Sequence, residues 1–297
     1  MRMNQKEQKM TEFVLKPAKK EAVPALIGLW GKSGSGKTYS AILLARGLVG
    51  AKGKIAVIDT ENGRSKFYSH LAGGWLHLDL QPPFTTERYS AAFKFCEEQG
   101  ADVIVVDSMS HVWEGEGGVL DKAEEVGGFG LNKFKAPKIA HKRMVNSLMR
   151  SSIPVIFCIR AKDAIQQIGK GKDMEIKSLG WQPIAEKNFV FEMTLDLHMT
   201  KDGGYDLTTS KTVPEALRNA VKPDGKVSEA MGAAIAEWSG SGVSVDPAFI
   251  QLKQSGIDAS LLGIEAFTAW GQKLTLPQRE QVKPYLAEWT RAAKEVK

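Results

Sequence analysis

Residues 25–38 read ALIGLWGKSGSGKT, a short apolar run followed by a glycine-rich turn. The turn fits the pattern G-x-x-x-x-G-K-[S/T], in which backbone N–H groups and the start of a helix surround a phosphate. Its residues are Gly31, Lys32, Ser33, Gly34, Ser35, Gly36, Lys37 and Thr38. In this pattern the lysine reaches the β- and γ-phosphates, and the threonine hydroxyl is a ligand of Mg²⁺. The stretch therefore predicts a strand, a phosphate-binding loop and a helix, with ATP and Mg²⁺ as the expected cofactors.

Short apolar runs alternate with helix-like segments on both sides of this loop. The runs are residues 25–30, 54–59, 75–80, 103–106 and 154–159. A continuous apolar run such as Val103–Val106 is typical of a strand that is buried on both faces of a parallel sheet. Segments 37–49, 86–98 and 136–150 have helical spacing. Strands that alternate with helices predict a mainly parallel α/β sheet with right-handed crossovers.

Two of the expected strands end in acidic residues. Asp107 follows an apolar strand, which places its carboxylate at the sheet edge that also carries the phosphate loop, where it would bind Mg²⁺ through water. The strand that ends at Asp59 continues into Thr60 and Glu61. A carboxylate at that point can orient or deprotonate the attacking water. Glu61 is the preferred candidate base and Asp59 is expected to orient or cap the turn, while a simply solvated Glu61 is the alternative.

The pattern changes after residue 188. Residues 189–199 and 205–209 flank Lys-Asp-Gly-Gly, which has hairpin chemistry and predicts an antiparallel extension at one sheet edge. A helix is expected near residues 227–238, before the linker-like stretch SGSGVSVDP. The expected divisions are a flexible basic arm (1–22), an α/β domain (23–239) and a small helical region (246–297). Thr275-Leu-Pro-Gln278 has the form of a capping box that opens the last helix.

Composition excludes several classes of protein. The chain has 297 residues, of which 43% are hydrophobic and 25% charged, as in ordinary globular proteins. No apolar run approaches the roughly 20 residues that a membrane-spanning helix needs. The N-terminal residues lack the apolar core of a secretory signal, so a cytosolic location is expected. Two cysteines, Cys96 and Cys158, form neither a disulfide framework nor a zinc site.

Charge is distributed unevenly along the chain, although its formal net value is only +6. Residues 101–131 carry seven acids and one base, and residues 132–177 carry eleven bases and three acids, a net of +8. A basic block inside a folded domain can bind phosphate backbones. It can also be a solvated helix face, which is the reading that charge alone favours.

The combination of GKSGSGKT, VIDTE, VIVVDS and IPVIFCIR resembles the core of the RecA-like recombinase ATPases. Within that group the chain looks most like the short ATP-binding proteins encoded by phages, some of which act in single-strand annealing recombination. The resemblance covers about residues 25–213. It implies a RecA-like P-loop fold and DNA-stimulated ATP hydrolysis in the cytoplasm of a bacterial host. The functional residues that it implies are Lys37, Thr38, Glu61 and Asp107.

The resemblance also implies partners, namely single-stranded DNA, further copies in a ring or filament, and a phage single-strand DNA-binding protein. The family has a polar sensor, usually Gln, at the end of the strand that follows the magnesium strand, where this chain has Arg160. A DNA loop would follow it at residues 166–177. The expected DNA contacts are Lys162, Lys170, Lys172 and Lys177. An earlier DNA loop, near residues 115–130, is acidic here, which argues against strong contact.

Two further residues would act between subunits if the resemblance extends to assembly. Lys211 would cross to the nucleotide of a neighbouring subunit, and Phe13 on the arm could support polymerisation. The alternative is a nucleotide-dependent switch or assembly factor that acts on a protein through the helices of residues 246–297. Their Trp270, Leu286 and Trp289 are also typical of a helical core. A small-molecule kinase is disfavoured because residues 160–172, the only candidate lid, contain a single arginine.

Overall fold

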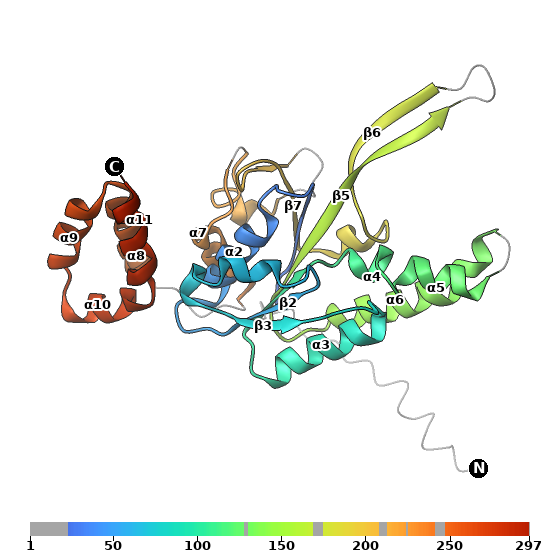
Figure 1. The fold of residues 1–297 in the computed structure, drawn as a ribbon, viewed down its shortest axis with the longest axis horizontal. Helices are drawn as coiled ribbons and strands as arrows, with labels where there is room; N and C mark the ends of the chain where they lie inside the picture. Colours follow the sequence, from blue (N-terminus) through green and yellow to red (C-terminus); the bar gives the residue numbers. More distant parts are fainter. Residues whose placement is uncertain are drawn as a thin grey trace, which may run out of the picture.

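The computed structural model of the chain describes residues 23–127, 130–168, 175–207, 213–223, 225–240 and 247–296. Figure 1 shows a central sheet flanked by helices, a two-stranded ribbon that projects from the sheet, and a group of C-terminal helices on the opposite side. The expected basic arm, residues 1–22, lies outside the described residues. Within the described part of the chain, no helix is long and apolar enough to cross a membrane.

A sheet with the strand order β3-β2-β4-β5-β1-β7-β8 forms the centre of the fold. Its strands are β1 (Leu26–Gly31), β2 (Ile55–Asp59), β3 (Leu76–Asp79), β4 (Val103–Asp107), β5 (Val155–Ile168), β7 (Leu195–Met199) and β8 (Tyr205–Asp206). All neighbours on this path pair in parallel except β7 and β8, which are antiparallel. The carboxyl ends of β1, β2 and β4 therefore meet at one edge of the sheet.

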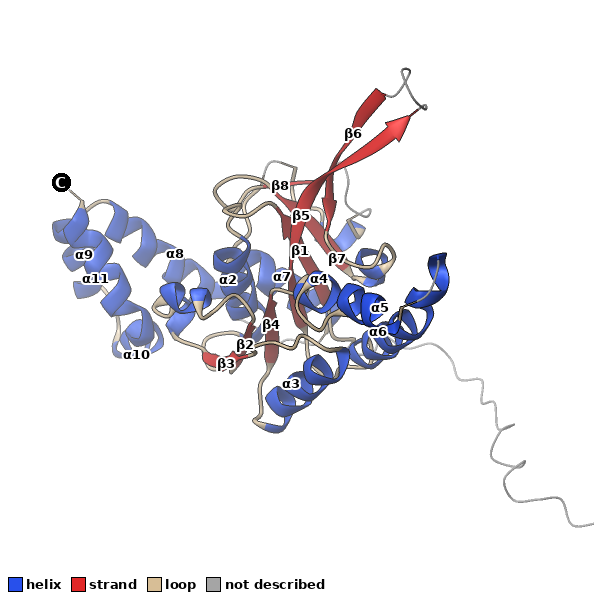
Figure 2. Ribbon diagram, turned by 45° about the vertical axis from the view of Figure 1, so that its right-hand side comes forward, coloured by secondary structure: helices blue, strands red, loops and turns tan. Residues whose placement is uncertain are grey.

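Helices cover both faces of the sheet, as the two colours in Figure 2 make clear. On one face, α2 (Lys37–Val49) and α7 (Glu229–Ser239) pack on alternate strand residues such as Ile27 and Leu29. On the other face, α3 (Thr86–Glu98) and α6 (Lys135–Leu148) pack on Leu26 and Trp30. Because successive strand side chains point to opposite faces, each continuous apolar run contributes to both cores.

Short helices connect these elements along the sheet edge. They are η1 (Arg64–Tyr68), η2 (Leu71–Gly73), α4 (His111–Glu114), α5 (Val119–Val126), η3 (Gly130–Phe134), η5 (Phe189–Glu192) and η6 (Glu215–Leu217). The acidic segment 115–130, expected as a loop, contains helix α5, which packs against α6.

The predicted α/β class is confirmed: the sheet is mainly parallel, its edge has an antiparallel extension, and helices follow at the C-terminus. Helices 37–49 and 86–98 have the predicted bounds. The expected hairpin at residues 201–204 joins β7 to β8, although β7 itself runs parallel to β1.

The predicted end of the strand at residues 154–159 is wrong. Strand β5 continues to Ile168 and pairs antiparallel with β6 (Glu175–Pro183), so much of the expected DNA loop is a β-ribbon. The register pairs Ala161 with Pro183 and Ile168 with Glu175. Residues 169–174, between the two strands, lie outside the described residues. Strand β5 extends beyond the buried sheet because it pairs with β6. The sequence of either segment alone does not reveal this pairing.

The C-terminal helices have a hydrophobic core of their own. They are α8 (Pro247–Leu261), α9 (Ile264–Gln272), α10 (Leu276–Val282), η7 (Lys283–Tyr285) and α11 (Leu286–Glu295). Trp289 is only 4% exposed, and Trp270 and Leu286 pack against the same core, so these side chains serve packing within the helical group. Thr275 and Gln278 form the predicted capping box, but it opens α10, and the last helix begins at Leu286.

Candidate nucleotide-binding site

The glycine-rich turn has the backbone conformation that its sequence requires. Gly36 lies at φ 85° immediately before α2, in the left-handed region that glycine adopts without strain. Gly31 is closely packed, because a Cβ atom there would lie 2.5 Å from the backbone oxygen of Met199. The turn can therefore follow the end of β1 closely and direct the first N–H groups of α2 towards a bound anion.

Lys37 and Thr38 lie at the start of α2 and face the end of β4. The Lys37 ammonium donates to the backbone oxygens of Gly31 and Lys32, each at 2.9 Å. The Thr38 hydroxyl donates to the carboxylate of Asp107. Strand β5 lies between β1 and β4, and the helix start spans this separation. The structure thus brings together Lys37, Thr38 and Asp107, and Glu61 lines the same cavity.

Burial shifts the pKa values of Asp107 and Lys37. Burial raises the pKa of Asp107 to about 6, although the hydrogen bond from Thr38 acts in the opposite direction. Burial also lowers the pKa of Lys37, and the nearby Cys158 and Asp107 partly offset that effect. A buried carboxylate that meets a hydroxyl at the end of a phosphate loop is a suitable donor set for Mg²⁺, which is usually held by one or two protein oxygens together with substrate phosphates.

Asp59 organises the turn that carries Glu61, as its expected orienting role required. Its carboxylate accepts from the backbone N–H groups of Glu61 at 2.7 Å, Gly63 at 3.2 Å and Ser65 at 3.0 Å, and from the Ser65 hydroxyl. Burial alone would raise the pKa of Asp59, but these hydrogen bonds outweigh it and lower the pKa. Asp59 is therefore committed to the turn and to His77 on β3, whose Nε2 atom is 3.4 Å from its carboxylate, and Glu61 is the carboxylate of this turn that lines the cavity.

His111 lies between Glu61 and Arg160, an arrangement that the sequence analysis did not predict. Its Nε2 atom is 3.8 Å from a Glu61 carboxylate oxygen and 3.4 Å from a guanidinium nitrogen of Arg160. The same guanidinium nitrogen is 3.8 Å from Glu114. The ring of Phe84 stacks on the imidazole, with 4.9 Å between ring centroids. The imidazole thus lies between the candidate base and the candidate sensor and contacts the sensor, Arg160.

The hydrogen bonds around His111 indicate its tautomer. Its Nδ1 atom is 2.7 Å from the Thr60 hydroxyl oxygen, and that hydroxyl donates to the backbone oxygen of Ser108. Nδ1 therefore carries the proton, and Nε2 offers a lone pair to Arg160, whose guanidinium can only donate. Burial lowers the pKa of His111, which favours this neutral form, while Glu61 acts in the opposite direction.

Glu61, Asp107 and Arg160 line one cavity of about 250 Å³ together with the phosphate loop. Three more of its lining residues were not predicted: Arg64, Phe67 and Tyr68, all on η1. Arg64 and His111 both follow the carboxyl ends of strands, where α/β proteins gather ligand-binding residues, and that position is the signal that could have identified them. Lys211 and Phe13, the two residues expected to act between subunits, fall outside the described residues.

The expected DNA-binding lysines do not share this cavity. Lys162 and Lys177 are exposed on the ribbon, where they pair with Gln182 and Gln166, respectively. Lys170 and Lys172 lie outside the described residues.

Comparison with known proteins gives little beyond this geometry. No family model matches the chain, and no curated protein matches it. Among solved structures, a KaiC-like protein of the hyperthermophilic archaeon Pyrococcus horikoshii is similar, with 12% sequence identity and a TM-score of 0.32 over 57% of this chain and 90% of that chain. A likeness this weak carries no weight for fold or chemistry, which follow from the residues of this chain.

The charges around the cavity are complementary to a nucleoside triphosphate with its metal ion. Lys37, Arg64 and Arg160 contribute cationic groups, and Glu61 and Asp107 contribute carboxylates on the side of β2 and β4. Cations favour a polyanionic phosphate chain, whereas the carboxylates can hold a metal ion and a water molecule. The cavity can therefore hold a polyanionic phosphate chain with its metal ion and also a water molecule that could attack it.

Proposed function

We propose that the chain binds ATP with Mg²⁺ in this cavity and hydrolyses it. One observation carries the proposal: Thr38 donates to Asp107 across the sheet edge, in a cavity that Lys37 and Glu61 also line. Separate elements, β1–α2, β2 and β4, supply these residues, and the fold brings them to one place. Calorimetric titration with ATP and Mg²⁺ tests binding, and Lys37→Ala should abolish it while leaving the protein folded.

Each residue has a distinct part in the proposed reaction. The Lys37 ammonium exchanges its two backbone oxygens for phosphate oxygens, and the loop N–H groups bind the β-phosphate. Thr38 and Asp107 would hold Mg²⁺, which supplies charge neutralisation of the phosphates when bound. Glu61 orients water towards the γ-phosphate and accepts its proton. Arg160, which lines the cavity and donates to His111, would respond to the charge of the γ-phosphate.

The second part of the proposal is that single-stranded DNA binds along the β5–β6 ribbon. The ribbon extends away from the sheet in both ribbon views, so a strand of nucleic acid could reach it (Figures 1 and 2). The register puts Lys162 and Lys177 on one face of it, whereas Ile165, Ile176 and Trp181 occupy the other and are exposed. Lysines bind phosphates, and an exposed indole can stack on a base.

A salt titration of DNA binding tests this interface. In the double variant Lys162→Ala/Lys177→Ala, we expect the slope of log K against log salt for a single-stranded oligonucleotide to fall by about 1.4, since each lost phosphate contact removes about 0.7. Lys273→Ala, which removes an exposed lysine from the C-terminal helices, is the matched control and should leave the slope unchanged. An unchanged slope in the double variant would remove the ribbon from the proposed interface.

The proposed setting is recombination or annealing in the cytoplasm of a bacterial host, as in the phage proteins that the sequence resembles. Further copies of the chain, in a ring or filament, and a phage single-strand DNA-binding protein are the proposed partners. The alternative is a nucleotide-dependent switch that acts on a protein. ATP turnover with and without single-stranded DNA separates the two, because the first predicts stimulation by DNA and the second predicts none.

A further inference from the structure

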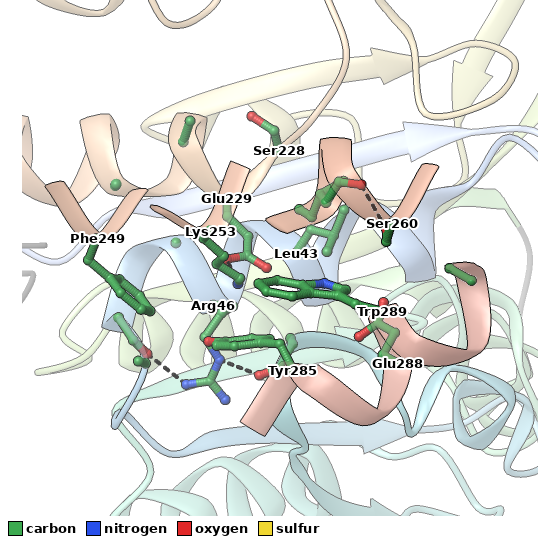
Figure 3. A pocket seen from close by; sticks show the side chains of 18 of the residues that line it. Leu43, Arg46, Ser228, Glu229, Phe249, Lys253, Ser260, Tyr285, Glu288 and Trp289 are labelled. Atoms are coloured by element: carbon green, nitrogen blue, oxygen red, sulfur yellow. Dashed lines mark hydrogen bonds and ion pairs between the residues drawn. The ribbon is translucent and has the colours of Figure 1, made fainter. Parts of the chain in front are cut away.

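A second cavity, of about 390 Å³, lies where the C-terminal helices meet the α/β domain. Helices α2 and α7 form one side of it, and α8, η7 and α11 form the other. Figure 3 shows Trp289 and Tyr285 in the middle of the cavity wall, with Glu229 and Lys253 on one side and Glu288 on another. A volume of this size is typical of small-molecule sites.

The two basic side chains in the wall already have partners. Lys253 donates to the carboxylate of Glu229 and lies 3.8 Å above the centre of the Tyr285 ring. The guanidinium of Arg46 donates to the backbone oxygens of four residues, Gly50, Gly53, Ala72 and Gly74. Both cationic side chains in the wall are therefore committed, and neither is available to bind an anionic ligand.

One carboxylate and one hydroxyl in the wall, by contrast, have no hydrogen-bond partner in the residues that the structure describes. Within the described part of the chain, Glu288 has no hydrogen bond or ion pair. Burial raises the pKa of its carboxyl; Lys253 and Arg291 oppose this effect and Glu229 reinforces it. Lys253 is ion-paired with Glu229, so Glu288 has the more distant charges of Lys253 and Arg291 to offset its own. The Tyr285 side chain is 2% exposed, and its buried hydroxyl has no hydrogen-bond partner among the described residues.

The rest of the wall is aromatic or small. Tyr39, Phe249, Tyr285 and Trp289 supply rings, and the last two stack with 5.5 Å between their centroids. Aromatic faces attract organic cations and bind apolar bodies. A neutral ligand would leave Glu288 without a counter-ion, and an anion would face carboxylates whose neighbouring cations are occupied.

We propose that this cavity binds a small organic cation, a primary ammonium or amidinium group on an aromatic or aliphatic body, with Glu288 as its counter-ion. The cationic group donates to the Glu288 carboxylate, and the body lies against Tyr39 and Trp289. Such a ligand joins the C-terminal helices to the domain that carries the phosphate loop.

The cavity is also next to the nucleotide site. Tyr39 follows Thr38 directly on α2 and contacts the ring of Tyr68 edge to face, with 5.9 Å between centroids. Tyr68 lines the nucleotide cavity. A cation that fixes Tyr39 therefore changes the packing of the nucleotide site, and ATP turnover should respond to it. This consequence rests on the proposed ATP hydrolysis, whereas binding of the cation does not.

The inference is tested by titrating the full chain with 2-phenylethylammonium. Calorimetry measures the affinity, and the rise in melting temperature gives a second measure of binding. The neutral 2-phenylethanol should bind at least about tenfold more weakly, as expected for the loss of a charge-assisted hydrogen bond. Glu288→Gln should remove the preference for the ammonium compound. Glu265→Gln, which changes an exposed carboxylate on α9, is the control and should keep it.

Two more variants fix the location of binding. Ala233→Leu, which fills the cavity from α7, should abolish binding without affecting ATP affinity. Lys37→Ala should lose ATP binding and retain the ammonium compound, so failure of the nucleotide proposal is distinguishable from failure here. Equal binding of the two probes, absence of binding, or an unchanged preference in Glu288→Gln would overturn the inference.

Discussion

Replacement of Glu61 by Gln gives the sharpest test of the nucleotide site. The backbone N–H of residue 61 donates to Asp59 at 2.7 Å, so the turn is held by the main chain and survives the change of side chain. Glutamine keeps the size and the hydrogen-bonding oxygen of glutamate but cannot accept the proton of the attacking water. We therefore expect ATP and Mg²⁺ to bind with unchanged affinity while turnover collapses.

The magnitude follows from the chemistry that is lost. Removal of a general base typically lowers the rate by about 10² to 10⁴, which corresponds to about 2.7–5.4 kcal/mol of barrier at 1.36 kcal/mol per tenfold. Single-turnover phosphate release measures the chemical step, and calorimetric titration measures nucleotide affinity separately. Together they distinguish a lost base from a lost binding contact.

Glu114→Gln is the matched control for this substitution. Glu114 is also a carboxylate near Arg160, at 3.8 Å, but it does not line the nucleotide cavity. It should change turnover by no more than a few-fold. Turnover in Glu61→Gln within a few-fold of the unmodified protein, or an equal loss in both variants, would refute the assignment of Glu61 as the base.

Three other predictions follow from particular contacts. His111→Leu keeps an apolar contact with Phe84 but removes the acceptor that holds the Arg160 guanidinium beside the nucleotide cavity, so kcat should fall about ten- to a hundredfold with little change in KM, as steady-state kinetics would show. Asp59→Asn should make the free energy of unfolding depend less on pH in acid. The folded-state pKa of Asp59 is lowered from 3.8, so its stabilisation is present above that value and is lost as the pH falls through the folded pKa. Urea unfolding at a series of pH values measures this dependence. Lys253→Met leaves Glu229 partly buried without its partner and should destabilise the docked C-terminal helices by about 3 kcal/mol, with Lys253→Met/Glu229→Gln regaining part of that loss in denaturant unfolding.

Local patterns were sufficient for the centre of the fold. The apolar run before Gly31 and the glycines after it prescribe strand, turn and helix start within a few residues of one another, and each side chain acts on its near neighbours. The run that ends in Asp107 is similarly self-contained, because a strand buried on both faces needs no partner pattern to be recognised. Asp59 could be assigned to the turn because a carboxylate before such a turn commonly binds the following N–H groups.

Other features depend on residues far apart in the sequence. His111 is held by Thr60, 51 positions earlier, so only the pairing of β2 with β4 makes its position visible. The β5–β6 ribbon depends on cross-strand pairing through a glycine- and lysine-rich stretch that by itself is typical of a loop. Trp289 on α11, considered as a docking residue, is buried because residues of α8, α9 and η7 pack around it. Helical spacing of aromatics cannot tell a core from an interface.

The segment between Glu61 and Gly74 connects the two cavities physically. At its start, Glu61 and Arg64 face the nucleotide cavity, and Tyr68 contacts Tyr39. At its end, Arg46 binds the backbone oxygens of Ala72 and Gly74, and a Cβ on Gly73 would lie 3.4 Å from Pro284 in the C-terminal helices.

This segment is therefore the element through which the nucleotide and the C-terminal helices can affect each other. If ATP binding moves η1, the contact of η2 with η7 must adjust, because few residues separate them along the chain. Linkage is reciprocal. If ATP raises the affinity of the protein for the cation by a given factor, the cation must raise the affinity for ATP by the same factor. A bound cation in the second cavity should thus change ATP affinity by the same factor by which ATP changes cation affinity, and a factor of one in calorimetric titrations would show that this segment does not couple the two cavities.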